Sequence, residues 1–103
     1  MSSLRLFMDT HDAASGTFPA GIGRAQFRAF FQQYEAACRA EGVVLVKVYV
    51  GYDGGRAFCL SMAADADAVR RAHERVGLPF DGITEVETAS PADTFLRLGD
   101  GEA

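Results

Sequence analysis

Residues 4–10 alternate between apolar and polar side chains, which predicts a first, half-buried strand. Residues 11–22 are rich in Gly, Ala, Ser and Pro and show no period, so they predict a loop that could act as a lid. Residues 23–42 then carry aromatic and small apolar side chains at helical spacing, and Gly42 lies where a helix usually ends. The first part of the chain therefore predicts a strand, a loop and a helix.

Residues 43–52 form a run of β-branched and aromatic side chains, which predicts a second strand. Residues 56–63 alternate again and predict a third. The Asp53-Gly54-Gly55 segment between them suits a tight turn, because glycine readily adopts the positive backbone angles that such turns require. We therefore expect an antiparallel hairpin.

A second helix is predicted after Asp65, whose side chain can cap the helix N-terminus. Its apolar stripe contains Val69, Ala72, His73 and Val76. The pair Gly77 and Pro79 should end this helix, and residues 83–88 predict a fourth strand.

The order strand, helix, strand, strand, helix, strand is that of a ferredoxin-like α+β sandwich, with a four-stranded antiparallel sheet and both helices on one face. We expect residues 1–90 to form this single domain and residues 91–103 to be a partly disordered C-terminal tail. In this fold the first and third strands are antiparallel neighbours, so the end of the first lies beside the start of the third. His11, Cys59 and His73 should therefore meet at one end of the molecule.

The two faces of the predicted sheet are both apolar. We expect the face that packs on the helices to carry Val44, Val46, Val48, Phe58, Leu60 and Met62. The open face would then carry Phe7, Val43, Leu45, Tyr49, Ala57 and Cys59. Because an exposed apolar face usually marks an interaction surface, we predict a homodimer through the open sheet face, with the candidate site at or near the interface.

Composition excludes several classes of protein. Of the 103 residues, 49% are hydrophobic and 23% are charged, as in an ordinary globular domain. The formal net charge of −4, with no basic stripe, argues against a nucleic-acid partner. No apolar run approaches the length of a membrane span and no cleavage signal is present, so we expect no membrane partner and a cytoplasmic location. Cys38 and Cys59 are both expected to be free thiols.

The chain has only two histidines and two cysteines, and three of these four residues are the ones that the fold gathers. Imidazole and thiolate bind nickel, copper or zinc, and a carboxylate could complete a mixed site, so the candidate metal ligands are His11, Cys59, Asp9 and His73. Strand parity places Asp9 and Cys59 on the open face and His73 beneath the sheet. His11, at the end of the first strand, could face either side, so it could serve a site on the open face with Cys59 or one at the helix end with His73. We favour the open face.

Each candidate also has a purely structural interpretation. Cys59 could pack as a small hydrophobic residue, and His11 could simply be solvated. His73 has the position of a core residue whose ring binds a nearby carbonyl. Asp9, on a central strand, needs a partner, which could be a metal ion, Lys47 or a partner chain.

Three segments resemble a known family: Met8-Asp9-Thr10-His11, Phe58-Cys59-Leu60, and the stretch from Ala68 to Pro79 that contains Ala-Val-Arg-Arg-Ala-His-Glu-Arg and Gly-Leu-Pro. They are similar to the DUF4242 family of small bacterial proteins, a group that includes an actinomycete nickel-binding protein. The resemblance implies a ferredoxin-like fold, often dimeric, that can hold a divalent metal such as nickel. The chain departs from many members at Ala64, where they have Pro, and from some at Leu78, where they have a further His.

The sequence contains no phosphate-binding loop, no HExxH, no Cys-x-x-Cys and no nucleophile turn. We therefore favour a non-catalytic protein that binds nickel, with zinc or copper as alternatives. Two other interpretations stay open. One is a cofactor-independent enzyme or small-molecule binder that uses Asp9 and His11 on the open face, and the other is a protein interaction module.

Overall fold

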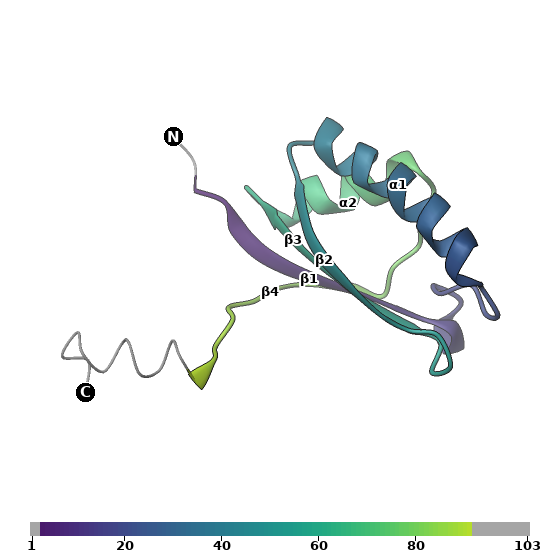
Figure 1. Cartoon of the computed structure of the whole chain (residues 1–103). Helices are drawn as coiled ribbons and strands as arrows, with labels where there is room; N and C mark the ends of the chain where they lie inside the picture. Colours follow the sequence, from purple (N-terminus) through teal and green to yellow (C-terminus); the bar gives the residue numbers. More distant parts are fainter. Residues whose placement is uncertain (1–2, 92–103) are drawn as a thin grey trace.

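The structure is a computed structural model that describes residues 3–91, and it is a two-layer sandwich of a sheet and two helices (Figure 1). The elements in chain order are β1 (Arg5–Asp12), the short 3-10 helix η1 (Ala13–Ser15), α1 (Arg24–Ala40), β2 (Val44–Gly51), β3 (Arg56–Ala63), α2 (Ala66–Arg75) and β4 (Gly82–Glu85). The sheet order is β2-β3-β1-β4, every pair is antiparallel, and both helices cover the same face. The predicted ferredoxin-like fold is confirmed.

Local signals place the ends of α2 as predicted. The Asp65 carboxylate accepts a hydrogen bond from the backbone N–H of Ala68 at 2.9 Å, so it caps the N-terminus. At the other end Gly77 has a φ of 63°, a left-handed conformation that glycine adopts without steric cost. The N–H of Leu78 donates to the carbonyl of His73 at 2.9 Å, and the N–H of Gly77 donates to that of Glu74 at 3.2 Å. This pattern is a Schellman motif, which turns the chain back across the end of the helix.

The register of the sheet brings the candidate residues together. Asp9 is paired with Cys59, and His11 with Ala57, as the antiparallel arrangement of β1 and β3 predicted. Strand β1 runs to Asp12, beyond the predicted end at Thr10. His11 is therefore inside a central strand and has a fixed direction.

The predicted assignment of the two sheet faces is wrong. Phe7, Asp9 and His11 are all buried, in alternation with the half-buried residues of the open face, and they lie on the side of the sheet that the helices cover. Because directly paired residues share a face, Ala57 and Cys59 lie on the helix-covered side as well, and Phe58, Leu60 and Met62 lie on the open side. Among the residues of β2 and its approach, Val43 and Leu45 pack in the core, whereas Val44 and Val46 are exposed. Val48 and Tyr49 have the faces that were expected, since they pair with Cys59 and Phe58.

Two physical reasons account for this inversion. A β-bulge between Leu45 and Lys47 shifts the register by one residue, so a single alternating pattern cannot describe all of β2. In addition, both faces of the sheet are apolar, so alternation alone does not decide which face the helices cover. Asp9 Oδ2 and both ring nitrogens of His11 have partners inside the protein, which offsets part of the cost of burying these polar residues.

The core between the layers is made of small and medium side chains around Phe7 and Tyr34. Its buried members are Phe7, Tyr34, Cys38, Val43, Ala63, Ala68, Val69 and Ala72, and Leu45, Val76, Leu78 and Ile83 pack against them. Both cysteines are free, as predicted. None of the helices in residues 3–91 combines the length and apolar character needed to span a bilayer. The tail predicted at residues 91–103 lies, except for Pro91, outside the described residues.

Candidate metal centre

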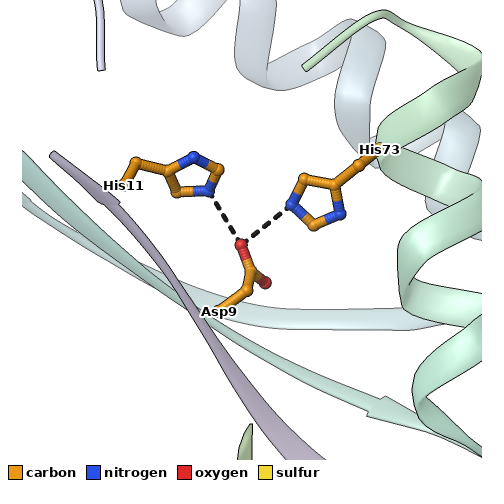
Figure 2. Close-up of side chains that lie close together, drawn as sticks. All are labelled: Asp9, His11 and His73. Atoms are coloured by element: carbon orange, nitrogen blue, oxygen red, sulfur yellow. Dashed lines mark hydrogen bonds and ion pairs between the residues drawn. The ribbon is translucent and has the colours of Figure 1, made fainter. Parts of the chain in front are cut away.

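The carboxylate of Asp9 lies between two imidazole rings that approach it from different layers of the fold (Figure 2). His11 is two residues further along β1, on the same face, and His73 is in the last turn of α2 above the sheet. The Nε2 atoms of His11 and His73 lie 2.8 Å and 2.9 Å from the same oxygen, Asp9 Oδ2. All three residues are at most 3% exposed, so this cluster is shielded from bulk water.

The other nitrogen of each ring faces a backbone carbonyl. His11 Nδ1 lies 2.8 Å from the carbonyl oxygen of Pro79, and His73 Nδ1 lies 2.8 Å from that of Val69, one helical turn earlier. A carbonyl oxygen can only accept a hydrogen bond, so both Nδ1 atoms carry the proton and donate it. In the neutral form of each ring, Nε2 then has no proton and carries a free lone pair.

Two lone pairs and a carboxylate oxygen that converge on one point repel each other unless a positive charge lies between them. Each of the two contacts with Asp9 Oδ2 needs either a proton, carried by a ring or by the carboxyl group, or a shared cation. The second carboxylate oxygen, Asp9 Oδ1, is buried and has no hydrogen-bond partner among the described residues. The cluster therefore has the donor atoms of a metal centre, together with a further carboxylate oxygen that no described residue contacts.

The segment after α2 holds both rings in place. The Schellman turn at Gly77 directs the chain back toward β1, where the carbonyl of Pro79 accepts a hydrogen bond from His11 Nδ1. The ring of Phe80 then packs on His73, with 4.7 Å between ring centroids. The two imidazoles stack on each other at 5.5 Å. One turn of backbone thus fixes the orientation of both rings.

Tyr34 supports the cluster from α1. Its hydroxyl group lies 3.2 Å from His73 Nδ1, and its ring packs on the imidazole at 4.8 Å. A ligating histidine typically has such an outer partner, which fixes its tautomer and its direction.

The charges of the cluster shift two pKa values. Burial of the His11 ring by itself disfavours its charged form, but the hydrogen bond and the negative charge of Asp9 outweigh burial and raise the pKa of His11 above its usual 6.5. For Asp9, burial acts to raise the pKa, and the hydrogen bonds from His11 and His73 outweigh it and lower the pKa below the usual 3.8. The carboxylate is therefore held in its charged form between the two rings.

Cys59 lies at the edge of the cluster, opposite Asp9 in the sheet. Its Sγ is 3.8 Å from His11 Nε2, which is a weak contact for a thiol. Burial, and then the negative charge of Asp9, raise the pKa of Cys59 well above its usual value, so the side chain is a neutral thiol at physiological pH. A neutral thiol is a poor metal ligand.

The structure thus brings all four predicted ligands together, although not where they were expected. They lie between the sheet and the helices, on the covered face, and the predicted open-face site is wrong. The sheet does not separate His73 from Asp9. Lys47, one of the partners considered for Asp9, is on the opposite face and is exposed.

Three contributors were not predicted as part of the site: the hydroxyl of Tyr34, the ring of Phe80 and the carbonyl of Pro79. Tyr34 continues the helical spacing of Phe27, Phe30 and Phe31, which is typical of core residues, and it does lie in the core. Every residue has a backbone carbonyl, so the sequence does not show that the carbonyl of Pro79 contacts His11. The Gly77 and Pro79 pair marked the turn but not the contact that it makes.

Comparison with known proteins identifies the family to which the chain belongs. The family model described as "Nickel responsive protein SCO4226-like" matches residues 7–86. The chain belongs to this SCO4226-like family. The match spans all of the four candidate ligands and the turn that orients them.

A solved structure supports the assignment of the chain to the SCO4226-like family. The chain is similar to SCO4226 from Streptomyces coelicolor A3(2), known from its crystal structure, with 33% sequence identity and a TM-score of 0.70. The alignment covers 82% of this chain and 99% of that one. No curated protein matches the chain. The expected link to small nickel-associated proteins is thus confirmed at the level of the family.

Proposed function

We propose that this protein binds one divalent transition metal ion, nickel in the first place, through Asp9, His11 and His73. The observation that carries the proposal is the shared contact: two Nε2 atoms, each with its Nδ1 proton committed to a carbonyl, face one oxygen of a buried carboxylate. Imidazole nitrogen is a good ligand for nickel, and the family description names a response to nickel. Zinc and copper bind similar donors and are the alternatives.

The spacing of the donor atoms suits this proposal. Two ligands at right angles, each about 2.1 Å from an ion, are about 3.0 Å apart. The two contacts with Asp9 Oδ2 measure 2.8 Å and 2.9 Å, close to this spacing. The three ligand atoms lie within 4.8 Å of one another, whereas two ligands of one ion are at most about 4.2 Å apart, so the proposal includes a small shift of the side chains on binding. Asp9 Oδ1 could serve as a further ligand atom, and Cys59 would join only if it lost its proton.

The balance of charge also favours exchange of protons for a metal ion. With a proton in each contact, the two rings and the carboxyl group together carry a charge of +1. A divalent ion with two neutral rings and a carboxylate carries the same charge. Binding can therefore release two protons without adding charge to a buried site, which avoids a further desolvation cost.

Titration of metal-free protein, freed of any affinity tag, with nickel in a calorimeter tests this proposal. We expect one ion per chain, and a loss of affinity of at least about 100-fold in His11→Gln and in His73→Gln, because each variant removes a ligand. Glu74→Gln, an exposed neighbour of His73 on α2, is the matched control and should bind like the unchanged protein. Equal affinity in all four proteins would contradict the proposal. Parallel titrations with zinc and copper rank the metals.

We also propose that two copies associate through the open sheet face. The support is the apolar surface that the structure leaves uncovered: Val44, Val46 and Tyr49 on β2 are 45–52% exposed, and the half-buried Phe58 and Met62 continue this face on β3. The metal centre lies on the other side of the sheet, so this dimer would not contribute ligands to it.

The free thiols Cys38 and Cys59 support the predicted cytoplasmic location.

A further inference from the structure

A cleft of about 350 Å³ opens beside the metal centre, between the loop that follows η1, the first half of α1 and the turn after α2. Its walls are mostly apolar and include Phe27, Phe30 and Phe31 of α1, Ala57 of β3, and His11 and Cys59. Asp9 and His73 are not among them. The cleft is thus a separate space that meets the centre through His11 and Cys59.

The aromatic stripe of α1 explains why this space exists. Phe27, Phe30 and Phe31 have the helical spacing of core residues, but they are only half-buried and do not belong to the buried core around Tyr34. The side chains opposite them on the sheet include Ala57, which is too small to fill the gap. Three phenylalanines that face an unfilled space are typical of a ligand pocket, and the volume is within the usual range of roughly 300–1,000 Å³.

The walls of the cleft define the ligand. No lining residue is a Lys, Arg, Asp or Glu, and both ring nitrogens of His11 already face partners in Pro79 and Asp9, so a charged ligand would lose its hydration without a free partner. The other polar side chains of the walls also have contacts within the protein: Thr17 with Asp12 and Asp81, Tyr34 with His73, and Cys59 with His11. The aromatic and proline side chains offer flat apolar surfaces against which a planar ring can stack.

The loop over the cleft is held in place without a ligand. The hydroxyl groups of Ser15 and Thr17 both donate to Asp81 Oδ1, at 2.7 Å and 3.0 Å. The N–H of Ala13 donates to the carbonyl of Gly55 in the β2–β3 turn at 2.8 Å. A pocket formed in advance binds with little ordering cost.

From these observations we infer that the cleft is a binding site for a small, neutral aromatic molecule of one or two rings, which makes its contacts mainly with Phe27, Phe30 and Phe31. The site does not require bound metal, because its walls are complete in the protein itself. It differs from the expected open-face site for a small molecule, since it lies under the helices.

Three probes that share one naphthalene ring system test the ligand class: 2-naphthol, which is neutral, naphthalene-2-carboxylate and 2-naphthylmethylammonium. Calorimetric titration of the metal-free and the nickel-loaded protein should show saturable one-to-one binding of 2-naphthol in both, and binding of each charged probe at least 10-fold weaker. Equal binding of a charged probe, or no saturable binding of 2-naphthol, would overturn the inference.

Two variants then locate the site. Val48→Phe fills the cleft from β2 and should weaken 2-naphthol at least 10-fold, and Ala57→Leu fills it from β3 and is the second test if the first fails to fold. Ala29→Leu, on the exposed side of α1, is the matched control. Unchanged 2-naphthol affinity in a folded filling variant would contradict the location. Nickel affinity, measured separately in the same proteins, reports on the metal centre and does not depend on this result.

Discussion

Asp9 is the residue on which the centre depends. It is fully buried on a central strand, and its partners are the two histidines rather than a lysine or a second chain. A buried carboxylate without partners is costly, so the sequence correctly indicated that Asp9 needs one. It could not indicate which, because His73 is 64 residues away and lies in another layer.

The pH dependence of stability in the metal-free protein follows from two shifted pKa values. The raised pKa of His11 means that its contribution to stability is complete below pH 6.5 and is lost as the pH rises through its folded-state pKa. The lowered pKa of Asp9 means that its contribution is present above pH 3.8 and is lost as the pH falls through its folded-state pKa. We expect the contribution of this pair to be greatest between pH 3.8 and 6.5, and urea unfolding in the presence of a chelator measures it.

Asp9→Asn is the control for this prediction. It removes the charge that raises the pKa of His11, so the decline in the free energy of unfolding above pH 6.5 should become shallower, and His11→Gln should have the same effect. Saturating nickel should reduce the decline in the free energy of unfolding above pH 6.5, because the ion replaces protons in the cluster and binds more tightly as the pH rises. A decline of equal slope in the unchanged protein and in both variants would show that the pair does not cause it.

At the scale of elements, the sequence predicted the order and type of both α-helices and all four strands in the described residues, but not the short 3-10 helix η1, which lies in the predicted loop. Strong local signals account for this success: the turn at Gly55, the cap at Asp65 and the glycine at position 77. The faces of the sheet could not be predicted in the same way. Both faces are apolar, and the bulge between Leu45 and Lys47 breaks the alternation on which such an assignment depends.

Gly77 and Asp65 offer a paired prediction, because they hold opposite ends of α2. Gly77→Ala forces a left-handed conformation on a residue with a Cβ, at a cost of about 1 kcal/mol, although open space surrounds that position. Asp65→Ala removes the N-terminal cap and also costs about 1 kcal/mol. Only the turn at Gly77 carries the carbonyl of Pro79 and the ring of Phe80 to the histidines. We therefore expect a several-fold loss of nickel affinity in Gly77→Ala alone.

Denaturant unfolding establishes that the two variants lose similar stability, and calorimetry then compares their affinities for nickel. An equal fall in affinity in both would show that general loss of stability, rather than the orientation of the rings, controls binding.

In the whole molecule, the candidate metal ligands and the exposed apolar residues lie on opposite sides of the sheet. The helices cover one face of the sheet, whereas the other face is left without a cover in residues 3–91 (Figure 1). The candidate metal ligands and the cleft lie on the covered side. The prediction of an apolar open face holds, with different residues from those expected. This arrangement allows association and metal binding to be changed independently.

Val44→Lys tests this independence. Val44 is 50% exposed on the open face of β2, so a lysine there would place a charge in the proposed dimer interface without disturbing the core. Light scattering coupled to gel filtration should find twice the mass of one chain in the unchanged protein and the mass of a single chain in the variant. Ala36→Lys, on the exposed side of α1, is the matched control and should stay dimeric. Nickel affinity should be the same in all three, because Asp9, His11 and His73 come from one chain; a loss of nickel binding on dissociation would mean that the second copy supports the centre through the sheet.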